Sequence, residues 1–223
     1  MKKIIFALFI IVLLVSCTKP SEAETADYQR DYLIVVNQDH SYTFGDKYDL
    51  NLQDDLAVTK QDTTGDEEKL EYKALQAFSD LRRACRNKGI LIGLLSGYRS
   101  KADQDWLYEN YDLTPQVRGG YSEHHTGLNI SLIIDDYLPD GDGPYWLSEG
   151  NKIPENEQVT ELLPDYGFIR RYPAGKENIT GHEAAPYEIR FVGSPEVAHE
   201  IMDNGLCLEE YVLQKCGGRL ACE

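Results

Sequence analysis

The feature that most constrains the fold is one short segment, Gly120–Ser131, in which a glutamate and two adjacent histidines stand between a glycine and an apolar run. Histidines in such a setting are where proteins place a metal ion or a general base. Two other segments combine apolar residues with charges. Ser96–Ser100 is a glycine turn that presents Arg99, and Ala185–Gly193 is an apolar run with charges at alternate positions. We expect these three segments to fold against one another.

Hydrophobic periodicity predicts the elements around them. The clearest is a helix over residues 67–87, which has one apolar face and ends at Gly89. The apolar face consists of Leu70, Ala74, Ala77, Phe78, Leu81, Ala84 and Cys85. Apolar runs predict strands at residues 32–36, 90–95, 128–134 and 186–192. Shorter periodic segments predict helices at residues 101–111, 158–163, 195–204 and 208–214.

In the helix at 101–111, we expect Trp106, Leu107 and Tyr111 to face the core. The chain shows no internal repeat, and its 223 residues suffice for one domain with a sizeable core. The predicted fold class is α+β, with helices packed on a small, mainly antiparallel sheet.

The N-terminus has the pattern of an export signal. Lys2 and Lys3 precede an apolar run at residues 4–16 that is too short to span a bilayer comfortably. The run ends in Leu14-Val15-Ser16-Cys17, which looks like a bacterial lipobox, so we expect Cys17 to carry lipid. The alternatives are an ordinary cleaved signal with an incidental cysteine and an uncleaved anchor. The expected organisation is a lipoprotein signal peptide at 1–17, a flexible tether at 18–30 and one domain at 31–223.

Cysteine usage follows from this export signal. With Cys17 lipidated, an even number of cysteines remains, and an exported protein can pair them. The remaining cysteines are Cys85, Cys207, Cys216 and Cys222. We expect two disulfides, in any of three connectivities, with at least one bridge holding the C-terminal tail.

The charge balance restricts the class of partner. The net charge is −16, and removal of Lys2 and Lys3 with the leader makes it −18. An acidic surface argues against nucleic acid and against anionic lipid headgroups as partners, and it keeps an exported domain soluble.

Taken together, the three segments resemble the zinc D-alanyl-D-alanine carboxypeptidases of the VanY type. That family has Ser-Gly-Tyr-Arg-Ser followed by Gln, then Ser-Glu-His-x-x-Gly-x-x-x-Asp, and last Glu-Pro-Trp-His-x-Arg. The chain has Ser96–Ser100 with Gln104, then Ser122–Ser131, and last Ala185–Arg190. The likeness extends from Asp31 to Tyr211 and implies a D-Ala-D-Ala metallopeptidase-like fold.

The resemblance also assigns site positions. The family binds zinc through a His, an Asp and a second His, with a Glu as general base. These positions hold His124, Ser131, Glu188 and Ala185 in this chain, so one of the four family residues is retained. Arg99 falls on the arginine that binds the oxyanion or a substrate carboxylate. Arg99, Gln104 and Ser122 are the substrate-binding residues that the resemblance implies.

Other polar residues suggest a rearranged site, namely Glu123, His125, His182 and Glu183. If His124 and His125 lie on a strand, their side chains point to opposite faces and cannot easily bind one ion. Both histidines have a second interpretation as packed, hydrogen-bonded residues. We expect Glu188 to pair with Arg99 or Arg190.

Two functional hypotheses follow. The first is an envelope lipoprotein that is anchored to the membrane by lipid and is non-catalytic. It would use no cofactor and would bind a peptidoglycan stem peptide or an envelope protein through the cleft in which the family binds zinc and substrate. The alternative is an active zinc D-Ala-D-Ala carboxypeptidase that uses a rearranged site. A purely structural envelope lipoprotein with no ligand is a third class.

Overall fold

The structure is a computed structural model, and it describes residues 31–43, 52–54, 69–111, 117–134 and 157–220. All of these belong to one compact unit, residues 31–223. The predicted signal peptide, the lipidation site at Cys17 and the tether lie outside the described residues. Within the described ranges, none of the helices has the length and apolar character needed to cross a membrane.

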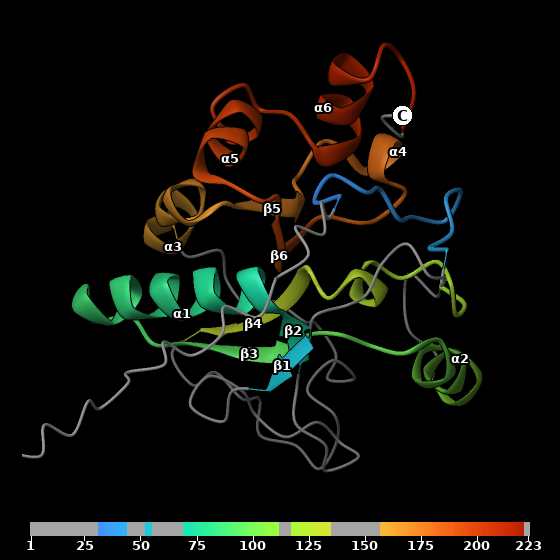
Figure 1. The fold of residues 1–223 in the computed structure, drawn as a ribbon, viewed down its shortest axis with the longest axis horizontal. Helices are drawn as coiled ribbons and strands as arrows, with labels where there is room; N and C mark the ends of the chain where they lie inside the picture. Colours follow the sequence, from blue (N-terminus) through green and yellow to red (C-terminus); the bar gives the residue numbers. More distant parts are fainter. Residues whose placement is uncertain (1–30, 44–51, 55–68, 112–116, 135–156, 221–223) are drawn as a thin grey trace, which may run out of the picture. The chain divides into compact units, whose positions relative to one another are not determined.

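A four-stranded antiparallel sheet forms the centre of the fold (Figure 1). Its strands, in spatial order, are β3 (Ile92–Ser96), β4 (Asn129–Ile134), β6 (Ala185–Phe191) and β5 (Phe168–Tyr172). All six residues of the inner strand β4 are buried, including the polar Asn129 and Ser131. The sheet confirms the α+β prediction.

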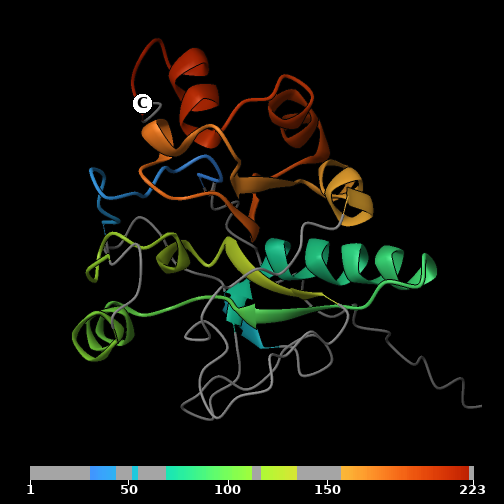
Figure 2. The ribbon, with the colours of Figure 1, turned by 180° about the vertical axis from the view of Figure 1, so that it is seen from behind.

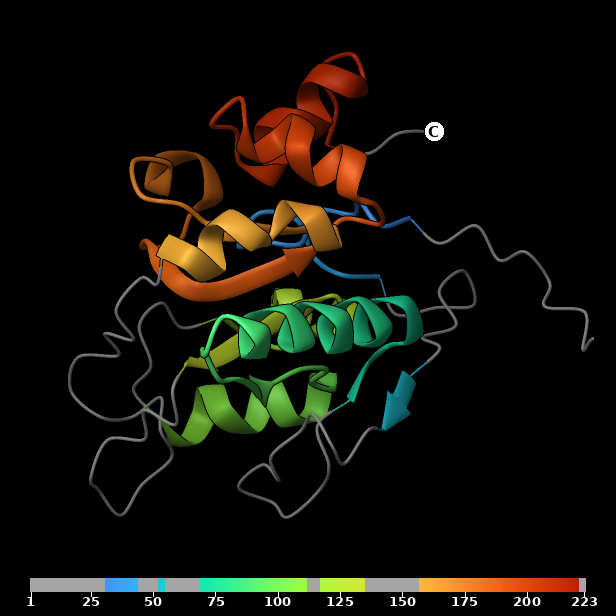
Figure 3. The ribbon, with the colours of Figure 1, turned by 90° about the vertical axis from the view of Figure 1, so that its left-hand side faces the viewer.

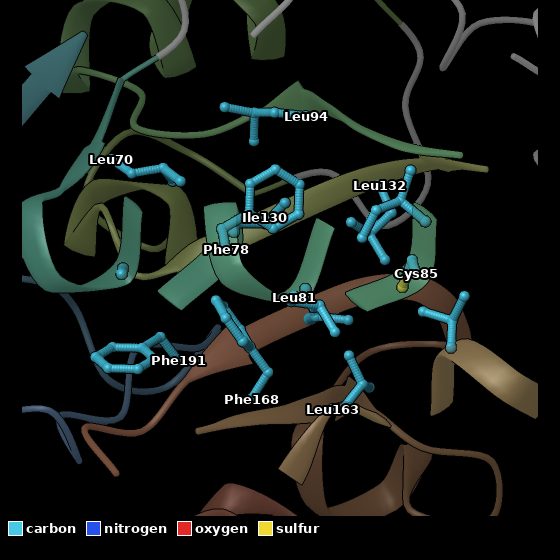
Figure 4. Close-up of a cluster of buried hydrophobic side chains, with 14 of the residues drawn as sticks. Leu70, Phe78, Leu81, Cys85, Leu94, Ile130, Leu132, Leu163, Phe168 and Phe191 are labelled. Carbon is cyan, nitrogen blue, oxygen red and sulfur yellow. The ribbon is translucent and has the colours of Figure 1, made fainter. Parts of the chain in front are cut away.

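Helix α1 (Tyr72–Asn87) packs along this sheet and buries its apolar face against it (Figure 4). The prediction began this helix at residue 67, but Leu70 belongs to the short strand β2 (Lys69–Glu71), which pairs with β1 (Leu52–Asp54). The helix starts where it does because the Glu71 side chain accepts a hydrogen bond from the Ala74 amide.

The remaining helices flank the sheet. Helix α2 (Lys101–Asn110) follows β3 and lies beyond the end of that strand (Figures 1 and 2). Figure 3 shows α3 (Glu157–Leu162) between α1 and the C-terminal helices α5 (Pro195–Met202) and α6 (Leu208–Lys215). Three short helical turns complete this part of the chain. They are η1 (Glu123–Thr126), η3 (Pro164–Tyr166) and α4 (Glu177–Thr180).

Two apolar clusters form the core. The first contains α1, most of the sheet and Phe168, and the second joins Ile169 to α5 and α6. Phe168 and Ile169 are neighbours on β5, so their side chains point to opposite faces of the sheet.

The structure corrects two details of the predicted elements. Residues 32–36 do not form a strand, because the carbonyl oxygens of Ile34 and Val36 accept hydrogen bonds from buried arginine side chains. Trp106 does not face the core, since 48% of it is exposed and its ring packs edge-on against Tyr111. Leu107 is buried as predicted.

The prediction of two disulfides is wrong. Cys85 and Cys207 are both buried thiols. Cys85 lies in the first apolar cluster, at the end of α1, and Cys216 lies in the second. Cys216 is disulfide-bonded, and its partner lies outside the described residues, as does Cys222. A bridge therefore holds the C-terminal region, but the other two cysteines do not pair.

Candidate functional site

His124 lies in η1, a single 3₁₀ turn that precedes β4. The Ser122 side chain caps the turn by accepting a hydrogen bond from the His124 amide. Gly127 ends the turn with φ +66°, a conformation that glycine adopts without strain. Ser122, one of the predicted substrate-binding residues, is buried and has this capping role in the fold.

The His124 ring is held in one tautomer. Its Nδ1 lies 2.6 Å from the Gly97 carbonyl oxygen, which can only accept, so Nδ1 carries the proton and Nε2 has a free lone pair. Burial and the nearby charge of Arg99 lower the pKa of His124 well below its ordinary value. Gly97 is required here because an added Cβ would lie 2.4 Å from the Lys69 carbonyl oxygen.

Ser131 and Glu188 face each other across neighbouring strands, since their Cα atoms are partners in the β4–β6 register. The Ser131 hydroxyl donates to Glu188 Oε1 at 2.6 Å, and Asn129 Nδ2 donates to Glu188 Oε2 at 2.5 Å. His124 Nε2 lies 3.5 Å from Ser131 Oγ and 3.9 Å from Glu188 Oε2. The structure therefore brings His124, Ser131 and Glu188 together around one point.

Burial raises the pKa of Glu188 above its ordinary value, although the hydrogen bonds from Ser131 and Asn129 and the charge of Arg99 oppose that shift. The expected pairing of Glu188 with Arg190 does not occur, because Arg190 Nε donates to Glu123. Sequence reasoning overlooked Asn129. Its polar side chain within the apolar run of β4 was the available signal.

Ala185 lies on the same strand as Glu188, beside a bulge. In the pairing of β5 with β6, Arg170 lies opposite Ile189 and Tyr172 lies opposite Ala185. Two residues along β5 therefore correspond to four residues along β6, which is the irregularity of a bulge. Ala185 is buried, and its methyl group can neither accept nor donate a proton.

Arg99 and Gln104 form a second polar group beside the histidine. The Arg99 guanidinium donates to Gln104 Oε1 at 2.8 Å and to Ser96 Oγ at 3.0 Å. Gln104 Nε2 donates to the Val117 carbonyl oxygen at 2.8 Å, and the Arg99 amide donates to the His124 carbonyl oxygen at 3.1 Å. The half-buried guanidinium is thus oriented by neutral groups and keeps its positive charge next to the histidine.

The residues suggested for a rearranged site have other roles. His125 Nδ1 lies 2.7 Å from the Arg99 carbonyl oxygen, and its Nε2 accepts a hydrogen bond from the Gly120 amide. Both ring nitrogens are therefore used in the fold. His182 stacks on Tyr172 with ring centroids 3.9 Å apart, and Glu183 is exposed.

Glu123 is the centre of a buried ion-pair network that sequence reasoning overlooked. It accepts hydrogen bonds from Arg171 Nε at 2.7 Å and from Arg190 Nε at 2.9 Å. Arg171 also pairs with Glu209 of α6 at 2.6 Å. Both arginines are fully buried. Arg190, inside the predicted strand at residues 186–192, was the available signal, because a buried charge requires a partner. The strand that carries Arg171 was not predicted.

The donor set does not fit a hydrolytic zinc ion. Such an ion is held by about three protein ligands with Cys, His, Asp or Glu donors and an open position. Here one of the three converging side chains is a neutral serine, and Glu188 already accepts two hydrogen bonds. Across the described part of the chain, no cluster of three or more His, Cys, Asp and Glu side chains is arranged to hold a metal.

The family model described as "VanY: D-alanyl-D-alanine carboxypeptidase" matches residues 67–194. A D-alanyl-D-alanine carboxypeptidase of Enterococcus faecalis is 29% identical over 213 residues, which is 87% of this chain and 70% of that protein. One of Enterococcus faecium is 32% identical over 138 residues, which is 61% of this chain but only 42% of that protein.

Solved structures give the same result for the fold. A mutant of the vancomycin-resistance D,D-pentapeptidase VanY, from a VanB-type cassette and in complex with Zn(II), matches with a TM-score of 0.59 at 28% identity. The match covers 82% of this chain and 99% of the other. VanYB in complex with D-alanine-D-alanine matches with a TM-score of 0.58 at 28% identity, over 81% of this chain and 97% of the other. The antiparallel sheet, the three motifs and these matches agree, and the chain belongs to the VanY family of D-alanyl-D-alanine carboxypeptidases.

Proposed function

We propose that residues 31–223 form a domain that binds the carboxylate end of a peptidoglycan stem peptide without zinc-dependent hydrolysis. The observation that carries this proposal is the hydrogen bonding of Glu188. Both of its carboxylate oxygens accept hydrogen bonds, from Ser131 and from Asn129, at the position where the family has a neutral histidine. Glu188 is thus engaged with side chains of the fold at the position that holds zinc in the family.

The chain lacks residues that the family uses for two steps of zinc-dependent hydrolysis, namely the binding of zinc and the activation of the zinc-bound water. Ser131 replaces an anionic ligand with a neutral hydroxyl, which lowers the affinity for zinc. Ala185 replaces the base that takes the proton of the zinc-bound water, and such a base typically contributes about 10²–10⁴-fold to the rate. A zinc ion that did bind would still lack its proton acceptor.

The retained residues are those that hold a ligand. A guanidinium matches a carboxylate in charge and in geometry, so Arg99 is the residue we assign to the terminal carboxylate, with Gln104 holding its orientation. Relatives have the corresponding ligands: VanYB is solved with D-alanine-D-alanine, and an LD-carboxypeptidase, LdcB, is described by its peptidoglycan recognition. A protein partner in the same cleft is the second candidate ligand.

The test compares the wild type with the triple variant Ser131→Asp, Ala185→Glu and Glu188→His. Both receive a D-Ala-D-Ala peptide, with zinc and with a chelator. We expect no zinc-dependent release of D-alanine from the wild type, and zinc binding with partial hydrolysis in the variant, because ligands and base act as a unit. Release of D-alanine by the wild type at an ordinary enzyme rate, stopped by the chelator, would contradict the proposal.

We also propose that the protein is a lipoprotein of the bacterial cell envelope, anchored through Cys17. The basic, apolar leader and the sequence Leu14-Val15-Ser16-Cys17 support this. Mass spectrometry of the mature N-terminus should find a lipid-modified Cys17. An unmodified peptide that begins elsewhere would contradict it.

The alternative is an active zinc carboxypeptidase with a rearranged site. One observation favours it: His124 uses Nδ1 on the Gly97 carbonyl oxygen, which leaves the Nε2 lone pair available to a metal ion. This alternative predicts that the wild type binds zinc and that His182→Ala abolishes the binding. The proposed function predicts that His182→Ala leaves the metal content unchanged.

A further inference from the structure

Two buried acceptors, His124 Nε2 and Glu188 Oε2, lie 3.9 Å apart, and the amide of Asn129 donates to Glu188. We call His124 Nε2, the Glu188 carboxylate and Asn129 Oδ1 the acceptor cluster. All three side chains are at least nine-tenths buried. They come from η1, β6 and β4, so the tertiary structure alone brings them together.

The hydrogen bonds around the cluster establish that each member is an acceptor. His124 uses its single proton on the Gly97 carbonyl oxygen, which leaves the Nε2 lone pair toward the cluster. The Asn129 side chain donates to Glu188 through Nδ2, and its other polar atom, Oδ1, is an acceptor that this hydrogen bond does not use. Among the described residues, Asn129 Oδ1 has no hydrogen-bond partner although it is buried.

Donors are scarce at this point. The Ser131 hydroxyl has one proton, and Glu188 receives it. The Asn129 amide lies 3.4 Å from His124 Nε2, which is too long for a strong hydrogen bond. A carboxylate has about four lone-pair positions, and the bonds from Ser131 and Asn129 use two of them. The cluster therefore lacks donors, and an unsatisfied buried acceptor is costly.

We propose that the acceptor cluster binds a primary ammonium group, so that the preferred ligand combines a carboxylate with a free amine. An ammonium carries three N–H donors and a positive charge, which suit the three acceptors and the charge of Glu188. The ligand class is an unblocked short peptide or amino acid. The inference depends on the proposed function in one point only, namely that Arg99 binds the carboxylate of the ligand.

Charge separates the two halves of this site. The guanidinium of Arg99 donates to Ser96 and Gln104, whereas the negative charge of the site is on Glu188, which receives its hydrogen bonds from Ser131 and Asn129. A zwitterion bound with its carboxylate at Arg99 and its ammonium at Glu188 pairs each charge with the opposite one. A ligand with a blocked amine leaves the acceptors without donors.

The experiment titrates the protein with D-Ala-D-Ala and with N-acetyl-D-Ala-D-Ala by calorimetry, at neutral pH and with a chelator present. Charge-assisted hydrogen bonds are strong, so acetylation should weaken binding by about ten-fold or more. Glu188→Gln should remove this preference, so that the two peptides bind the variant with similar affinities. Glu161→Gln, which changes an exposed carboxylate, should keep the preference.

Several outcomes would overturn the inference. If the wild type binds the two peptides with equal affinity, the inference is wrong but the proposed function stands. The same holds if Glu188→Gln still prefers the peptide with the free amine. Zinc that binds without a chelator and displaces D-Ala-D-Ala would identify the cluster as a metal site. An affinity for D-Ala-D-Ala that Arg99→Ala does not weaken would instead contradict the proposed function alone. No binding of either peptide would contradict both.

Discussion

At the scale of residues, Glu188 determines what the cleft can do. A buried carboxylate needs hydrogen bonds, and here neutral donors supply them: the Ser131 hydroxyl and the Asn129 amide. These donors bring no charge of their own, and Arg99 is the nearby positive group that acts on Glu188. The site thus combines a positive guanidinium with a carboxylate and a neutral histidine, which suits a small charged ligand.

The raised pKa of Glu188 predicts a pH dependence of stability. Burial raises this pKa above its ordinary value of 4.5. The folded protein therefore holds the proton to higher pH than the unfolded chain, and the free energy of unfolding falls as pH rises through this window. Glu188→Gln removes the titration, so denaturant unfolding should show that the variant gains stability relative to the wild type as pH rises from about 4.5. Parallel pH profiles of the two proteins would contradict this.

At the scale of elements, one carboxylate fixes the turn that carries His124. Glu123 in η1 binds Arg171 of β5 and Arg190 of β6, and its Oε1 also lies 3.4 Å from the Val36 amide. The turn is thereby joined to two strands and to the N-terminal segment of the domain. Glu123 is a positioning residue for His124, since its own bonds all go to the fold.

Removal of the Glu123 charge should destabilise the domain strongly. Glu123→Gln leaves two fully buried guanidinium groups with less compensating charge, and breaking a buried pair of this kind typically costs about 3–5 kcal/mol. Urea unfolding should report this loss. Lys101→Met, which breaks an exposed pair with Asp105, should change the stability little and serves as the control. A loss for Glu123→Gln no larger than that of the control would contradict the role of the network.

At the scale of the whole molecule, the sheet separates two apolar clusters, and this separation keeps Cys85 away from Cys216. Cys85 lies in the cluster under α1, while Cys216 lies in the cluster of α5 and α6. A disulfide requires Cα atoms within about 7 Å. An even number of cysteines in an exported protein permits pairing but does not place the partners together.

Thiol labelling tests this arrangement. The unfolded but unreduced protein should contain two reactive thiols, at Cys85 and Cys207, whereas the native protein should react slowly because both are buried. Burial also raises the pKa of Cys207 to about 11, which disfavours the reactive thiolate. Peptide mapping should identify the labelled residues. Complete protection of the unfolded, unreduced protein would contradict the structure.

The sequence by itself determined the fold class, the antiparallel sheet, most helices and the family, because these depend on local periodicity and on motifs read along the chain. The same motifs located His124, Ser131, Glu188 and Arg99. Only the tertiary structure placed His124 on a 3₁₀ turn, brought Asn129 to Glu188 and joined Glu123 to two buried arginines. Hydrogen bonds between residues distant in sequence depend on register and on bulges, and neither is encoded in periodicity.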